Sequence, residues 1–160
     1  MKNEFKVLFE ASRQKVFSAV GLVEASLKGL ESYDPNKTYS PKELEPYDAL
    51  SDRFIRAVET CIKFFKTYEY YLYAFSTNTY RDLLLNMEKQ GIISEVEMWI
   101  DMRDIRNRIV HDYLPHQIKN IYDLVMGEFK DELLIVNEKI EMIILDKDSN
   151  ENKTNGAHKD

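Results

Sequence analysis

The chain has very little cysteine, glycine and proline, and it has no long apolar run. Its 160 residues include one cysteine, five glycines and four prolines. A single cysteine, Cys61, excludes an internal disulfide and any metal site built from several thiolates. Cys61 stands among apolar residues, and we expect it to be an inert core side chain. The apolar runs are only a few residues long, which predicts that no segment spans a membrane.

Excess positive charge is also missing. The formal net charge is −6, whereas nucleic-acid binders are usually basic because phosphate contacts dominate their affinity. The count argues against a broad surface for RNA or DNA, but it leaves room for a small, locally basic cleft. It also fits a protein whose main partner is another protein. The N-terminal residues lead into an amphipathic pattern and not into the apolar core of a signal peptide, so we expect a cytoplasmic location.

What the chain does have is helical periodicity. Apolar residues recur at three- and four-residue steps, and no run alternates as a strand would. The pattern predicts helices at residues 4–31, 47–75 and 79–90, a fourth from Ser94 to about residue 114, and a last one at 115–145. Pro115 disfavours helical geometry at Leu114 and so separates the last two.

Local signals refine these helices. The segment 33–46 contains three prolines and reads as a loop, with one capped turn at Ser40–Glu43. Thr77 or Asn78 is expected to cap the third helix and Gly91 to end it. Ser94 and Glu97 have the spacing of a capping box for the fourth helix.

The predicted fold class is therefore all-α, an up-and-down bundle of four to five helices in one domain over residues 1–145. Residues 146–160 are rich in Asn, Asp and Lys, which predicts a disordered tail. The segment 68–73 holds four tyrosines and is too aromatic all round to be buried on one face. It indicates a covered second face, and so a dimer or a partner contact.

One short segment in the fourth helix carries the chemistry. Arg106, His111 and Tyr113 fall within eight residues. An arginine grips a phosphate with a planar set of donors, and a histidine moves protons near neutral pH. Together they suffice, in principle, to cleave RNA without a metal.

Helical geometry leaves the roles of these residues open. At 100° per residue, Arg106 shares a stripe with Trp99 and Met102, which equally favours a buried structural ion pair. His111 lies about 140° round the helix from Arg106, where it fits an exposed charge network with Asp104. The two side chains meet only if the helix deforms before Pro115 or if a second subunit completes the site. Tyr113 equally fits a core or interface aromatic.

Other signatures are missing from the sequence. It has no Gly-rich phosphate loop, no Gly-x-Ser-x-Gly elbow and no His-Glu-x-x-His motif. His111 and His116 are wrongly spaced for one helical face, and His158 lies in the tail, so we expect no metal site. We expect no cofactor either.

The motif resembles that of the HEPN superfamily, small helical bundles of prokaryotic defence and toxin–antitoxin systems. The resemblance rests on Arg106, the polar Asn107 and His111, and Tyr113 narrows it to the HepT branch. It extends from about residue 51 to Tyr113. Members of this branch are toxins paired with a minimal, MNT-type nucleotidyltransferase.

The resemblance implies a homodimeric, metal-independent endoribonuclease that acts on tRNA or mRNA. Arg106 would stabilise the scissile phosphate, His111 would be the general acid or base, and Asn107 would position the RNA or the histidine. The products would be a 2′,3′-cyclic phosphate and a 5′-hydroxyl. The partner nucleotidyltransferase, the antitoxin, would transfer AMP from ATP onto Tyr113 and so silence the nuclease.

Similar bundles are also substrate-binding subunits of a two-chain nucleotidyltransferase, and they carry a nearly identical motif. The net negative charge suits that protein-partner role at least as well. Asp112, between the histidine and the tyrosine, places further negative charge beside the expected RNA site. A non-catalytic binding subunit is therefore the alternative to the toxin.

Overall fold

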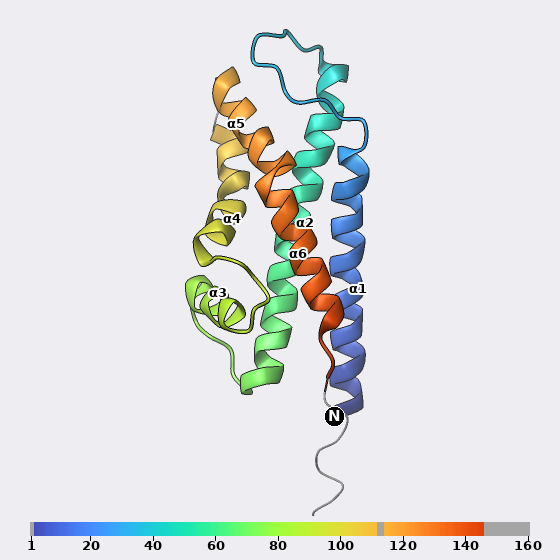
Figure 1. Cartoon of the computed structure of the whole chain (residues 1–160), viewed down its shortest axis with the longest axis vertical. Coiled ribbons are helices and arrows are strands. Elements are labelled where there is room, and N and C mark those ends of the chain that lie inside the picture. The colour runs from blue at the N-terminus through green and yellow to red at the C-terminus, as the bar shows by residue number, and fades with distance from the viewer. Residues whose placement is uncertain (1, 112–113, 146–160) are drawn as a thin grey trace, which may run out of the picture.

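The computed structural model describes residues 2–111 and 114–145 and confirms the all-α bundle (Figure 1). Within these residues it has six helices and no strand. They are α1 (Lys2–Leu27), α2 (Pro41–Tyr73), α3 (Tyr80–Lys89), α4 (Val96–His111), α5 (Pro115–Met126) and α6 (Glu128–Met142). The predicted tail, residues 146–160, lies outside the described residues, and so do Asp112 and Tyr113.

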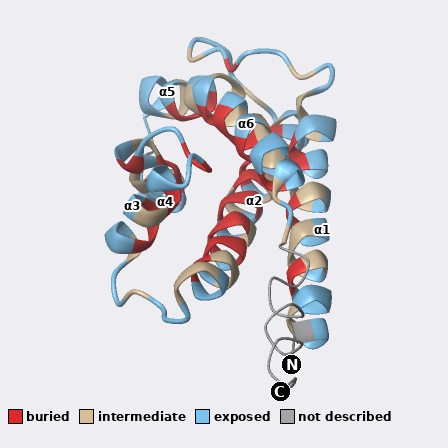
Figure 2. Cartoon of the chain, turned by 60° about the horizontal axis from the view of Figure 1, so that its bottom comes forward, coloured by how far each residue is buried: buried red, intermediate tan, exposed pale blue. Residues whose placement is uncertain are grey.

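The two longest helices, α1 and α2, form the spine of the bundle. They pack side by side along most of their length, and α6 lies along α1 (Figure 1). On the other side, α2 contacts α3, α4 and α5. The buried side chains therefore line the interior along α2, which faces neighbours on several sides (Figure 2). Among the described residues, no helix is long and apolar enough to cross a membrane.

Helix α2 begins earlier than predicted. Ser40 Oγ accepts a hydrogen bond from the Glu43 N–H at 3.2 Å, and Glu43 Oε2 accepts one from the Ser40 N–H at 2.8 Å. This capping box starts the helix at Pro41, whose missing N–H costs nothing at the first position. Pro46 lies inside the helix and removes one backbone donor. The predicted loop thus contributes a turn and a half to α2, which buries Tyr47.

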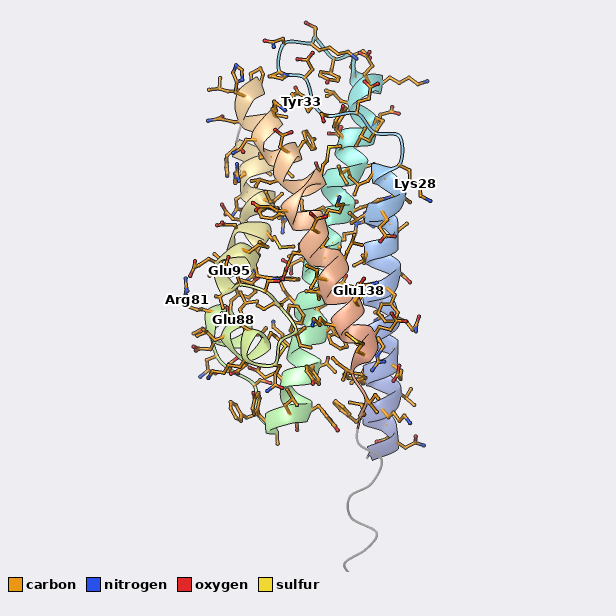
Figure 3. All side chains as sticks on the ribbon, in the orientation of Figure 1. Lys28, Tyr33, Arg81, Glu88, Glu95 and Glu138 are labelled. Carbon is orange, nitrogen blue, oxygen red and sulfur yellow. The ribbon has the colours of Figure 1, made fainter. Side chains whose placement is uncertain are left out.

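The capping predictions for α3 and α4 were partly wrong. Thr79, not Thr77 or Asn78, caps α3 by accepting from the Asp82 N–H at 3.1 Å. Gly91 has a φ of +69°, which suits the predicted end of that helix. The box expected between Ser94 and Glu97 does not form. Ser94 binds Glu132 of α6, while Glu97 forms an ion pair at 2.6 Å with Arg81 of α3, which is labelled in Figure 3.

The predicted last helix is broken into α5 and α6. The break is at Gly127, where φ is −108° and ψ is −112°. A Cβ atom added there would lie 2.8 Å from the carbonyl oxygen of Asp123, closer than carbon and oxygen tolerate. Only glycine fits this turn, and the break lets α5 and α6 pack against each other.

The core is dominated by large aromatic side chains. Trp99 and Phe65 are fully buried and meet edge to face with their ring centroids 4.9 Å apart. Phe54 of α2 stacks on Phe129 of α6 at 6.0 Å. Cys61 is fully buried, as predicted, and burial raises the pKa of its thiol to about 12. The thiol therefore stays protonated and unreactive at neutral pH.

Candidate functional site at the end of helix α4

Helix α4 turns a different face inward from the one that the helical wheel predicted. Its buried side chains are Val96, Trp99, Met102 and Ile105. Ile105 is fully buried, whereas its neighbour Arg106 is exposed. The interpretation of Arg106 as a buried structural ion pair is therefore wrong. The guanidinium faces solvent, where a ligand can reach it.

A buried carboxylate fixes the start of α4. Glu132 of α6 is only 3% exposed, and its Oε1 accepts hydrogen bonds from the Trp99 indole N–H and the Ser94 N–H, both at 2.9 Å. Its Oε2 accepts from the Ser94 hydroxyl at 2.6 Å. The first backbone N–H of α4, on Val96, is satisfied by Glu88 Oε2 at 2.9 Å. Two carboxylates from other helices thus set the position of α4.

Sequence reasoning missed Glu132, although a signal was present. Phe129, Leu133, Val136 and Ile140 are all buried, and Glu132 falls on the same face of α6. A carboxylate within an apolar stripe is expected to have hydrogen-bond donors around it. The sequence alone does not say which donors these are, because they come from residues 33 and 38 positions away.

One turn before Arg106, Arg103 ties α4 to its neighbours. Its guanidinium lies 4.3 Å from the centroid of the Tyr80 ring in α3, and its Nε is 3.7 Å from Glu59 Oε1 in α2. The Tyr80 hydroxyl donates to the Trp99 carbonyl oxygen at 3.1 Å. Burial raises the pKa of Tyr80, so this hydroxyl remains a donor at any physiological pH. The basic residues beyond Arg103 therefore extend from a well-anchored helix.

The predicted site residues form an open surface. Arg106, Asn107 and His111 are all exposed. The Asn107 amide donates to Asp104 Oδ1 at 3.0 Å, one turn back along the helix. Within residues 2–111 and 114–145, no side-chain hydrogen bond or ion pair engages Arg106 or His111. Both groups are therefore accessible to a ligand or a partner.

In a single chain, Arg106 and His111 point in different directions. α4 stays α-helical through His111, so the two residues are about 140° apart and separated by about 7.5 Å along the axis. No deformation within α4 brings them together, since the helix continues to His111 and the extended residue Leu114, with a ψ of 136°, stands directly before Pro115 of α5. Of the two routes to a shared site, only the second subunit remains.

Large apolar side chains flank His111. Val110 is 56% exposed and Leu114 is 63% exposed, and His116 is exposed in the first turn of α5. Basic groups at the C-terminal end of a helix are favoured by its dipole, and Arg108 and His111 occupy the last turn of α4. The result is an exposed surface that is both apolar and basic. Such a surface suits a partner protein or a ligand with phosphate groups.

The same end of the bundle holds a cluster of tyrosines. The rings of Tyr33 and Tyr39, in the α1–α2 connection, stack at 4.8 Å, and Tyr33 lies 5.5 Å from Tyr122 of α5. Tyr47 completes the cluster and donates from its hydroxyl to the Glu31 carbonyl oxygen at 2.7 Å. Burial raises the pKa of Tyr47 to about 12. The cluster holds the α1–α2 connection against α5 (Figure 3).

Residues 21–142 match the model of the family described as "Nucleotidyltransferase substrate binding protein like". The chain belongs to this family. No match was found among curated proteins.

Membership in the nucleotidyltransferase substrate binding protein-like family bears on the site. The matched region contains α2 to α6 whole, and with them Arg106, Asn107 and His111. It supports the resemblance to HEPN-type helical proteins in its broad form. The narrower HepT-type reading of the motif stays a prediction, as do the catalytic roles of Arg106 and His111.

Proposed function

We propose that this chain is the helical partner of a nucleotidyltransferase and that it presents the end of α4 to that enzyme. The observation that carries the proposal is the family match over residues 21–142, which takes in the whole of α4 and α5. The net charge of −6 also suits a protein partner better than a broad nucleic-acid surface.

The end of α4 is the surface that best suits this role. Val110 and Leu114 are exposed apolar side chains of the kind that form the centre of an interface. Arg106 and His111 stand beside them without side-chain partners in the described part of the chain, and either can receive a phosphate. A nucleotidyltransferase holds a nucleoside triphosphate, so this surface matches both the protein and its nucleotide.

Binding of the nucleotidyltransferase provides the direct test. We expect the double variant Val110→Asp and Leu114→Asp to weaken the complex with the cognate enzyme at least tenfold, because it places charge in the centre of the interface. Leu85→Asp is the matched control, since Leu85 is 41% exposed on α3. Isothermal titration calorimetry measures both. Equal affinity of the double variant and the wild type contradicts the proposed surface.

A metal-independent endoribonuclease is the second candidate, and the exposure of both Arg106 and His111 favours it. In this reaction the ribose 2′-oxygen attacks the phosphorus and the 5′-oxygen leaves. His111 takes the 2′-hydroxyl proton or gives one to the leaving oxygen, and Arg106 stabilises the charge on the phosphate. The products are a 2′,3′-cyclic phosphate and a 5′-hydroxyl. Cleavage that persists in EDTA is the expected result, and a chain inert on tRNA and mRNA contradicts this candidate.

Modification of Tyr113 would connect the two candidate functions, the partner of a nucleotidyltransferase and the endoribonuclease. The partner would transfer AMP from ATP to the phenol oxygen of Tyr113, with release of pyrophosphate. The bound AMP is bulky and anionic, and it would compete with RNA for the Arg106 guanidinium. A nucleotidyltransferase that binds the end of α4 would then also control whether this surface acts on RNA.

Mass spectrometry tests this modification. After incubation with the partner and ATP, we expect the wild-type chain to gain the mass of AMP on the peptide that contains Tyr113, and Tyr113→Phe to gain none. Tyr70→Phe is the control, because Tyr70 is 55% exposed at the far end of α2 and should be modified like the wild type. AMP on the same peptide of Tyr113→Phe refutes the assignment.

A further inference from the structure

A groove between α1 and α2 is independent of the α4 surface and has no role in the proposed function. Its volume is about 620 Å³. Its lining includes two leucines and four cations, which are Leu8, Lys15 and Leu22 on α1 and Arg53, Arg56 and Lys63 on α2. We call it the α1–α2 groove.

The α1–α2 groove is basic in a chain that is acidic overall. Four of its lining side chains are cations, and none of the lining side chains, all of them between residues 8 and 67, is acidic. Arg56 is paired with Asp52 beside the groove at 2.7 Å, and Arg53 donates to Ser26 Oγ at 2.8 Å. Lys15 and Lys63 are exposed. Asp52 compensates one of these four cations, and the positive charge that remains favours an anionic occupant.

The spacing of the lining residues fits a helix. Leu8, Lys15 and Leu22 are seven residues apart on α1, and Arg56 and Lys63 are seven apart on α2. A seven-residue repeat keeps one face of a helix turned toward a nearly parallel neighbour, as in coiled coils. Residues 8–22 of α1 are about 21 Å long, which matches a helix of about four turns.

The α1–α2 groove also offers exposed apolar side chains to such a helix. Leu8 is 59% exposed and Leu22 is 46% exposed, and they lie towards the two ends of the groove with Lys15 between them. Leucines of an amphipathic helix would cover them, and its acidic side chains would reach the exposed cations Lys15, Arg56 and Lys63. Nucleic acid fits less well, because none of the lining residues is aromatic and single strands bind by stacking as well as by charge. A symmetric contact of two grooves would place cations against cations.

We infer that the α1–α2 groove binds an acidic amphipathic helix of another protein. The helix would lie along the groove with an apolar seam against Leu8 and Leu22 and with glutamates or aspartates toward Lys15, Arg56 and Lys63. This inference does not rest on the proposed function, because the groove shares no residue with the end of α4.

A synthetic helical peptide of about four turns, with leucine in the seam and glutamate beside it, is the probe. Fluorescence anisotropy with the full chain measures its binding, next to a peptide in which lysine replaces each glutamate. We expect the acidic peptide to bind more tightly by at least tenfold, with an affinity that falls as salt is added. Equal binding of the two peptides, or no binding of the acidic one, overturns the inference.

Charge reversal locates the site. In Lys15→Glu with Lys63→Glu, we expect the preference to change sign, so that the lysine peptide binds and the glutamate peptide does not. The control, Lys28→Glu with Lys66→Glu, changes the net charge equally at exposed positions outside the groove (Lys28 is labelled in Figure 3) and should bind as the wild type does. If the control also loses the preference, binding reflects net charge alone and the inference fails.

Two further measurements test whether RNA or a second copy of the chain occupies the groove instead. If an RNA oligonucleotide binds more tightly than the acidic peptide and loses affinity only in the groove variant, the groove is a nucleic-acid site and the inference is wrong. If light scattering shows that the groove variant alone changes the oligomeric state, a second copy occupies the groove and the inference is again wrong. Unchanged mass and weak RNA binding support a helix from another protein.

Discussion

Glu132→Ala is expected to lower the free energy of unfolding by about 3 kcal/mol, because it removes the acceptor of buried and partly buried donors at once. The Trp99 indole N–H would remain buried without a partner, and Ser94 would lose both of its bonds to α6. A cavity left by the side chain adds to the loss. Urea unfolding followed by circular dichroism measures the change.

The fluorescence of Trp99 reports the same event locally, since it is the chain's single tryptophan. In Glu132→Ala, we expect the wavelength of its emission maximum to change, because the indole N–H loses its carboxylate acceptor. Glu138→Ala is the control on the same helix, because Glu138 is exposed (Figure 3); it should change stability by less than about 0.5 kcal/mol. A Glu132→Ala protein as stable as this control would show that the carboxylate contributes little.

Glu132 also matters for the site, because it determines where α4 begins. The helix carries Arg106 and His111 at its far end, so a displaced start moves both of them. A second buried carboxylate, Glu69 of α2, acts similarly for α3. It accepts from the Thr77 N–H and hydroxyl and from the Asn86 amide, at 2.8 to 3.0 Å. Two carboxylates therefore hold the helices that lie between α2 and α5.

The sequence predicted the helices well because their apolar stripes are long and regular. The fold class follows from this periodicity, and Pro115 predicted the boundary between the fourth and the last helix. Boundaries were harder where a few side chains decide them. The sequence predicted the capped turn at Ser40–Glu43 but not its continuation through Pro46 into α2, and nothing in the apolar pattern indicated that Gly127 would break the last helix.

The candidate site was predicted in position but not in orientation. Trp99, Met102 and Arg106 follow one another at three- and four-residue steps, and Trp99, Met102 and Ile105 follow at three-residue steps. Both spacings fit a stripe along one face of a helix, so the sequence alone does not choose between them. Contacts with α2, α3 and α5 select the second stripe, since α4 packs against all three helices. That choice turns Arg106 outward. Single-helix periodicity does not contain this information, because it depends on where the neighbouring helices lie.

Subunit complementation is expected to separate a shared catalytic site from a site within one chain. Under the ribonuclease proposal, Arg106→Ala and His111→Ala should each lower the rate of RNA cleavage at least a hundredfold, since one removes a charge-stabilising donor and the other a proton carrier. Arg81→Ala is the matched control at an exposed position on α3 and should retain the wild-type rate.

Mixing the two inactive variants adds the decisive result. Because α4 holds Arg106 and His111 about 140° apart in one chain, we expect a phosphate that touches both to lie between two subunits. A heterodimer of the two variants then contains one intact pair, Arg106 from the His111→Ala chain and His111 from the Arg106→Ala chain. With random exchange of subunits, about a quarter of the wild-type rate returns.

The cleavage rate of the mixture distinguishes a site shared by two subunits from a site within one chain. This comparison does not depend on the stability of either variant. Recovered cleavage after the variants are unfolded together and refolded requires a composite site across the dimer. If each variant alone is inactive and the refolded mixture remains inactive, both groups act within one chain, which the helical geometry of α4 opposes. If His111→Ala alone cleaves at the wild-type rate, His111 is no proton carrier, and the role of partner to a nucleotidyltransferase is left as the function of this surface.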